Sequence, residues 1–219
     1  MPKKVRVWDL PTRLFHWSLL ALFATSWLSA ELGGNAMQYH LWSGFAVLTL
    51  LLFRLLWGFI GSDTARFKQF LRGPAAVRAY ARTLLERNAK SGAGHNPLGG
   101  WMTASLLLTL LVQAGTGLFA NDDIATEGPL YKFISKDLSD QLSSVHEVAF
   151  NVLMTLVVIH IAAIVFYRVY KRDNLLRPML TGSKDLPESV TPPRMRQGWL
   201  ALPVIMVAAG VVYWLVASV

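Results

Sequence analysis

Two histidines lie in one apolar stretch that is long enough to cross a membrane. The stretch covers residues 142–167 and contains His146 and His160. Fourteen residues at about 100° each come within about 40° of whole turns, so both imidazoles share one helix face, about 21 Å apart along the axis. An ionisable side chain inside hydrocarbon is costly and is usually there for function. The spacing therefore predicts one functional position in each leaflet.

Two further histidines match these depths. His16 lies on the basic side of the first apolar stretch, level with His160, and His40 opens the second stretch, level with His146. Imidazoles paired across facing helices can give an iron its two axial nitrogens. We therefore expect two bis-histidine haem b groups, an outer one held by His40 and His146 and an inner one held by His16 and His160.

Two other interpretations of the histidines stay open. Zinc or copper also binds imidazole, but a tetrahedral zinc site usually has three or four protein ligands, and each level here offers two. Alternatively, the histidines only form hydrogen bonds between helices. The chain has no cysteine, which excludes disulfides, iron–sulfur ligation and a covalently attached c-type haem.

The elements that must position these residues are transmembrane helices. The chain has 219 residues, of which 53% are hydrophobic and only 16% charged. Segments of about 20 apolar residues can span a bilayer only as helices in a chain of this kind. We expect an all-α integral membrane protein: a four-helix haem-binding bundle within residues 1–182, and a fifth transmembrane helix within residues 183–219. The predicted spans cover residues 14–32, 40–60, 98–120, 142–167 and 199–217.

The basic residues predict an orientation. Of the 21 Lys and Arg residues, 18 lie in the N-terminal lead, in residues 61–97 or in residues 168–198. The positive-inside rule assigns these segments to the cytoplasm, and five spans would put the C-terminus on the opposite side of the membrane. The net charge of +8 is thus explained by topology and by anionic lipid, and nucleic-acid binding is not expected.

We expect other residues to contribute to these two haem sites. Arg54 is predicted near the inner level, where it would pair with a haem propionate beside Arg13, or else extend to the interface. Gly44 would give a flat macrocycle access to the backbone beside His40, or else serve close helix packing. Gly115 and Gly117, near Gln113 in the third span, are explained first by close helix packing and second by clearance for a porphyrin edge.

Local signals predict where helices begin and what connects them. Thr12 is expected to cap the first helix and Asn96 the third. Ser144 with Glu147 resembles a capping box that would start the fourth helix or fix His146. Short amphipathic helices are expected on the inner membrane surface within residues 61–97. His95 lies at the end of that segment, without a partner at matching depth, so a structural role is favoured.

Several strings together resemble the bacterial cytochrome b family. They are RLFHW, LFRLLWGFIGSDTARF, GHNPLGGW and TGLFANDDI, combined with the four histidines in register. This family includes b-type subunits of nickel-iron hydrogenases, the membrane subunit of formate dehydrogenase and b-561-type cytochromes. The resemblance covers about residues 5–182. It implies two haems b ligated by His16, His40, His146 and His160, and electron exchange with the quinone pool.

The expected function is respiratory electron transport. We expect a di-haem cytochrome that carries electrons across the membrane between quinone and a periplasmic or peripheral redox protein, such as a c-type cytochrome or a hydrogenase. A stand-alone quinone-linked oxidoreductase, for example one acting on superoxide, and a haem-free anchor for a redox partner are the alternatives. Enzymatic activity of its own and oligomerisation are left open.

Overall fold

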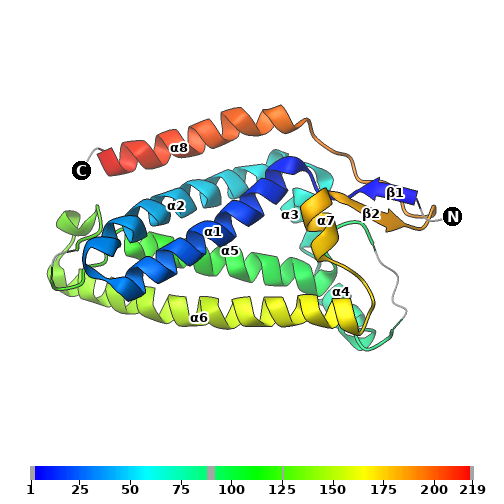
Figure 1. The fold of residues 1–219 in the computed structure, drawn as a ribbon, viewed down its shortest axis with the longest axis horizontal. Helices are drawn as coiled ribbons and strands as arrows, with labels where there is room; N and C mark the ends of the chain where they lie inside the picture. Colours follow the sequence, from blue (N-terminus) through cyan, green and yellow to red (C-terminus); the bar gives the residue numbers. More distant parts are fainter. Residues whose placement is uncertain (1–2, 88–91, 125, 218–219) are drawn as a thin grey trace. The chain divides into compact units, whose positions relative to one another are not determined.

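The structure is a computed structural model that describes residues 3–87, 92–124 and 126–217, and it is mostly helical (Figure 1). The helices are α1 (Leu10–Leu32), α2 (Met37–Ile60), α3 (Phe67–Phe70), α4 (Pro74–Arg82), α5 (Pro97–Gly117), α6 (Lys136–Val169), α7 (Leu176–Thr181) and α8 (Ala201–Ala217). There are also two short strands, β1 (Lys3–Arg6) and β2 (Ser183–Leu186), and short 3-10 turns between the helices.

Four helical segments are long and apolar enough to cross a membrane, as judged by length and composition. Within the described residues these are Gly34–Ile60, Pro97–Gly117, Lys136–Val169 and Gly198–Ala217. They correspond to four of the five predicted spans, including the C-terminal one. The remaining prediction, residues 14–32, falls within α1, which is helical over 23 residues but carries Arg13 and Glu31. The prediction of a multi-pass helical membrane protein is confirmed, and five spans remain a prediction.

Two predicted helix starts were wrong. The cap of α1 is Asp9, whose carboxylate accepts the backbone N–H of Thr12 at 2.8 Å, so the helix begins at Leu10 with Pro11 in its first turn. Helix α6 begins at Lys136, and Ser144 lies inside it with its hydroxyl donating to the Asp140 carbonyl. The cap of α5 was predicted correctly, because Asn96 Oδ1 accepts the Gly99 N–H at 2.7 Å.

The chain divides into two compact units. Unit 1 comprises Met1–Leu14, Leu55–Leu106 and Leu156–Ala201. Unit 2 comprises Phe15–Arg54, Leu107–Thr155 and Leu202–Val219.

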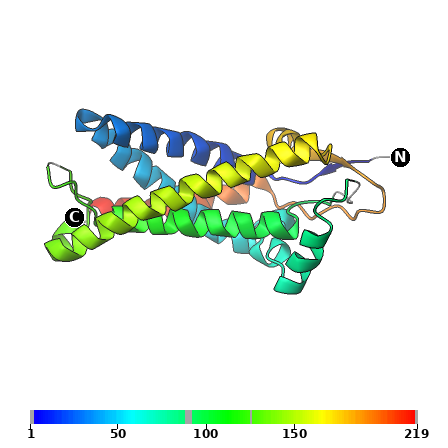
Figure 2. The ribbon, with the colours of Figure 1, turned by 90° about the horizontal axis from the view of Figure 1, so that it is seen from below.

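Unit 2 is built from helical segments. Within it, α1 and α2 form a hairpin whose turn contains Gly33 and Gly34, both at positive φ (61° and 52°), which glycine adopts without a Cβ clash (Figure 1). The α5–α6 connection lies at the same end of the unit as this turn (Figures 1 and 2). The ring of Trp27 on α1 packs 6.2 Å from that of Phe150 on α6.

Unit 1 contains a small sheet that the sequence did not reveal. Strands β1 and β2 pair antiparallel, with Val5 opposite Lys184. Val5, Val7, Trp8 and Leu186 form a buried apolar cluster beside this sheet. A strand of four residues such as KKVR gives no clear alternating pattern, so its pairing partner, almost 180 residues away, could not be recognised.

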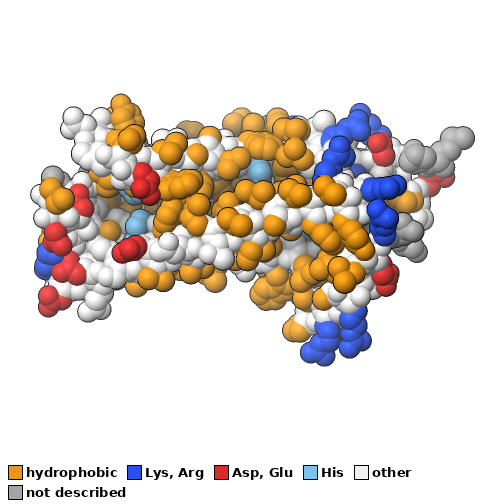
Figure 3. Space-filling model, turned by 60° about the horizontal axis from the view of Figure 1, so that its bottom comes forward, with side chains coloured by type: hydrophobic (Ala, Val, Ile, Leu, Met, Phe, Trp, Pro, Cys, Tyr) orange, Lys and Arg blue, Asp and Glu red, His pale blue; other side chains and the backbone are white. Residues whose placement is uncertain are grey.

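Charge is distributed very unevenly between the units. The sequence ranges of unit 1 contain 18 Lys and Arg residues and six Asp and Glu residues, whereas those of unit 2 contain three and seven. Figure 3 shows acidic side chains gathered at one part of unit 2, with histidine atoms visible between them. The basic segments predicted from the sequence therefore belong to one compact unit, and the acidic connection to the other.

Candidate functional site

Unit 2 contains a cavity of about 500 Å³. Residues from α1, α2, α5, α6 and the α5–α6 connection line it, among them His40, Gly44, Gln113, Gly117 and His146. This volume is in the range of small-molecule and cofactor sites. The cavity therefore brings together, in one unit, both residues of the predicted outer pair and three others that the sequence indicated.

His40 and His146 face each other across this cavity. Their ring centroids are 6.1 Å apart, and the rings are inclined at 74°. His40 lies in the first turn of α2, and His146 lies almost three turns into α6. Both rings are partly buried.

The Nδ1 atom of each ring contacts a backbone carbonyl. His40 Nδ1 lies 2.9 Å from the Ser26 carbonyl oxygen, and His146 Nδ1 lies 2.8 Å from the Gln113 carbonyl oxygen. A carbonyl oxygen can only accept, so each Nδ1 must carry the hydrogen. This assigns the same tautomer to both neutral rings and leaves each Nε2 with its lone pair, the arrangement found when Nε2 is a metal ligand.

The glycines near the two rings differ in their surroundings. A Cβ at Gly117 would lie 2.9 Å from Cε1 of His146 and 3.1 Å from its Nδ1. A Cβ at Gly44 would meet no atom of the described residues within 4 Å. Gly117 therefore allows close approach of the His146 ring, while Gly44 borders open cavity space. The close-packing explanation of Gly44 receives no support from these contacts.

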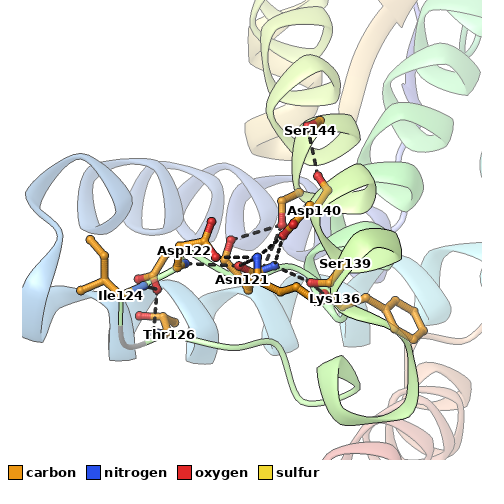
Figure 4. A network of polar contacts seen from close by, with 11 residues as sticks. Asn121, Asp122, Ile124, Thr126, Lys136, Ser139, Asp140 and Ser144 are labelled. Atoms are coloured by element: carbon orange, nitrogen blue, oxygen red, sulfur yellow. Dashed lines mark hydrogen bonds and ion pairs between the residues drawn. The ribbon is translucent and has the colours of Figure 1, made fainter.

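A polar network fixes the start of α6 against the end of α5 (Figure 4). Ser139 is fully buried, and its hydroxyl donates to the Phe119 carbonyl at 2.7 Å and accepts from Asn121 Nδ2 at 2.6 Å. Lys136 forms ion pairs with Asp123 and Asp140. These contacts set the position of α6 along α5, and so the position of His146 beside Gln113.

The described lining of the cavity is acidic. It includes Glu31, Asp122 and Glu147, and neither Lys nor Arg is among the described lining residues. Glu31 accepts a hydrogen bond from Trp27 Nε1 at 3.1 Å. A ligand with carboxylates would find hydrogen-bond donors such as Ser143 and Thr126 here rather than cations.

These residues fit a haem held by two imidazoles. Iron–nitrogen bonds of about 2 Å, with each ring centre about 1 Å beyond its nitrogen, would place the centroids about 6 Å apart. The measured 6.1 Å agrees with this separation. A metal centre with three or more ligands is less suitable, because no group of three His, Cys, Asp or Glu residues suited to a metal ion occurs within the described residues.

The predicted inner pair is divided between the units. His16 belongs to unit 2, where its ring meets Trp17 edge-on at 5.0 Å, and His160 belongs to unit 1 and is partly buried. Arg54, in unit 2, is only 2% exposed, and both explanations of it stay predictions. Arg13, in unit 1, donates to the Leu180 carbonyl at 3.0 Å. The pairing of His16 with His160 stays a prediction.

His95 is packed between aromatic rings of unit 1. Its ring lies 4.8 Å from that of Trp8 and 4.7 Å from that of Phe70. This packing supports the structural role expected from the sequence. In the same unit, Tyr167 shares a hydrogen bond with Tyr80 and accepts one from Asn96. No pattern in the sequence predicts this cluster.

Two histidines that face each other in a cofactor-sized cavity of a helical membrane protein are typical of b-type cytochromes. The profile of the family described as prokaryotic cytochrome b561 matches residues 7–182, and the chain belongs to this family. It is also 26% identical over 216 residues to the probable Ni/Fe-hydrogenase B-type cytochrome subunit of Bradyrhizobium diazoefficiens, an alignment covering 83% of this chain and 86% of that protein. No solved structure matches the chain. Membrane electron transfer and a b-type haem follow from the family.

Proposed function

We propose that this protein is a di-haem b cytochrome of the bacterial inner membrane. In this proposal it has five transmembrane helices and a cytoplasmic N-terminus, and it carries electrons between the quinone pool and a redox partner. His40 and His146 hold the outer haem, and His16 and His160 hold the inner one. The observation that carries the proposal is the 6.1 Å separation of the His40 and His146 rings, each with Nδ1 bound to a backbone carbonyl.

The protein's contribution at the outer site is to hold two neutral imidazoles with their tautomers fixed. The carbonyls of Ser26 and Gln113 fix both tautomers, and both acceptors are backbone atoms of neighbouring helices, so ring orientation follows helix position. A haem b held by His40 and His146 would supply the exchange of single electrons. Most of the described residues that line the cavity are apolar.

The name of the relative from Bradyrhizobium supports a proposal about the redox partner. Its name associates it with a Ni/Fe-hydrogenase, and we propose a peripheral redox protein of that general kind as the partner of this chain. We place the partner at the periplasmic side. The inner site, with Arg54 and Arg13 as candidate propionate ligands, is the proposed neighbour of quinone.

The proposal is tested by counting haems in the full-length protein. A pyridine haemochrome assay with redox difference spectra should give two haems b per chain for the wild type. Replacing His40 or His146 with Ala should leave one haem, and replacing His16 or His160 should leave the other, because an iron that loses one of two axial imidazoles is held much more weakly. The two pairs should remove spectrally different haems.

His95→Ala serves as the control for removal of a histidine as such. It should keep both haems, because His95 is packed between Trp8 and Phe70 in unit 1. Purification of the wild type without haem in mild detergent would contradict the proposal and favour the anchor alternative. Two haems retained in both His40→Ala and His146→Ala would contradict the outer ligand pair.

A further inference from the structure

Gln113 contacts His146 at both ring nitrogens. Its backbone carbonyl accepts the Nδ1–H at 2.8 Å, and its side-chain Nε2 lies 2.9 Å from Nε2 of the ring. Because Nδ1 carries the hydrogen, ring Nε2 is an acceptor, and the Gln113 amide must be the donor. One residue of α5, a helix without ligand histidines, therefore sets the tautomer of the ring and also occupies its coordinating nitrogen.

The second of these contacts excludes iron. An imidazole Nε2 has one lone pair in the ring plane, and it can accept a hydrogen bond or bind a metal, not both. The backbone contact at Nδ1 is compatible with either state and improves the ligand. The side-chain contact at Nε2 must therefore be broken whenever His146 binds iron.

The side-chain amide of Gln113 lacks one hydrogen bond in this position. Its oxygen, Oε1, is buried and has no hydrogen-bond partner among the described residues. A buried carbonyl oxygen without a partner is unfavourable, so the amide gains little on this side from staying in place. Thr116 Oγ1, which is 3.4 Å from His146 Nδ1, donates to backbone carbonyls of α5 and does not compete for Nε2.

We propose that Gln113 is a placeholder in the outer haem site: its amide protects Nε2 of His146 until haem binds, and then moves away while its carbonyl continues to hold Nδ1. This inference rests on the proposed role of His146 as a haem ligand. It makes Gln113 a positioning residue that controls how readily the outer site accepts haem. The exchange involves one hydrogen bond broken for one coordination bond formed, with no proton transferred.

The first experiment measures the hydrogen bond itself. Full-length protein produced under haem limitation is labelled with ¹⁵N-histidine, and the Nε2 shift of His146 is assigned by comparison with His146→Ala. Replacing Gln113 with Leu should move this shift downfield, towards that of a free acceptor nitrogen, while Nδ1 keeps its hydrogen. Replacing Gln141 with Leu, an exposed position on α6 outside the cavity, should change neither nitrogen.

The second experiment follows haem uptake. Haemin is added to the same haem-depleted proteins, and the Soret band is followed in time. Gln113→Leu should take up the outer haem about fivefold faster than the wild type, the equivalent of one net hydrogen bond. Gln113→Met, which also lacks a donor but keeps a flexible chain, should behave like Gln113→Leu and covers the case in which the Leu variant does not fold.

The outcomes separate this inference from the proposed function. Wild-type uptake rates and an unchanged Nε2 shift in the Gln113 variants, together with loss of one haem in His146→Ala, would overturn the placeholder role alone. Retention of both haems in His146→Ala would overturn the ligand assignment, whatever the Gln113 variants do. Faster uptake with a moved shift supports the inference.

Discussion

At the scale of single residues, the outer site depends on how closely α5 approaches the His146 ring. Gly117 has no side chain at a place where a Cβ would be 2.9 Å from the ring, so the ring can lie directly against α5. Gln113, one turn earlier, then reaches both nitrogens of that ring. Gly117 and Gln113, both on α5, thus position the His146 ring, which α6 carries.

Replacing Gly117 with Ala should displace the His146 ring. The added methyl must push the ring by several tenths of an ångström, and overpacking of this kind costs about 1–3 kcal/mol. We expect weaker retention of the outer haem, measured as haem loss to excess apomyoglobin, and a changed reduced-minus-oxidised spectrum of that haem alone.

Gly115→Ala is the matched control. It lies on the same helix, but a Cβ there meets nothing within 4 Å among the described residues. Gly115 lies one turn or less from Gly117 near the end of the same helix, so a larger effect at Gly117 reports the contact with His146. Equal haem loss from the two variants would contradict the positioning role of Gly117.

At the scale of elements, the position of α6 relative to α5 is set at their connection. The buried hydroxyl of Ser139 links the first turn of α6 to Phe119 and Asn121, beyond the end of α5. Because His146 follows on the same helix, about two turns later, any slip of α6 would move its ring away from Gln113. The connection, whose polar network Figure 4 shows, therefore supports the position of the His146 ring.

Replacing Ser139 with Ala should destabilise unit 2. The change leaves the Phe119 carbonyl without its donor in a buried place, a loss of about 1–3 kcal/mol. We expect the thermal unfolding midpoint in detergent to fall by on the order of 2–4 °C for each kcal/mol lost.

Ser144→Ala tests whether loss of any hydroxyl on α6 has this effect. Ser144 is exposed and donates only to the Asp140 carbonyl of its own helix, so its midpoint should stay close to that of the wild type. A midpoint of Ser139→Ala equal to that of Ser144→Ala would show that the network does not hold the helix start.

At the scale of the whole molecule, charge predicts how the chain lies in the membrane. The ranges of unit 1 hold 18 of the 21 Lys and Arg residues, whereas unit 2 has more acidic than basic residues. Positively charged segments stay on the cytoplasmic side during insertion. We therefore expect the α5–α6 connection to face the periplasm and residues 61–97 to face the cytoplasm.

Single cysteines can test this orientation, since the chain has none of its own. Ile124 is 90% exposed in the α5–α6 connection, and Leu85 is 71% exposed in the segment after α4. In intact spheroplasts, a membrane-impermeant maleimide should label Ile124→Cys and leave Leu85→Cys unlabelled until the cells are lysed. The reverse pattern would invert the topology and would place the outer haem on the cytoplasmic side.

The sequence by itself determined the class of protein and the residues that matter most. Apolar length fixes membrane helices because backbone groups must be paired internally in lipid. The place of each histidine along its apolar span gives its depth in the membrane, and equal depth is the reason why the sequence predicts the pairing of His40 with His146. The residue at which a helix begins is harder to predict. Asp9, rather than Thr12, caps α1, because two candidate caps three residues apart differ only in local geometry.

Only the tertiary structure decided what surrounds those histidines. A backbone carbonyl has no sequence signature, so the contacts of Ser26 with His40 and of Gln113 with His146 could not be read from residue types. The same holds for the pairing of β1 with β2 and for the clash that a Cβ would make at Gly117. Sequence periodicity specifies the face on which a residue lies, whereas the register and distance between helices depend on packing, and these decide which atoms meet.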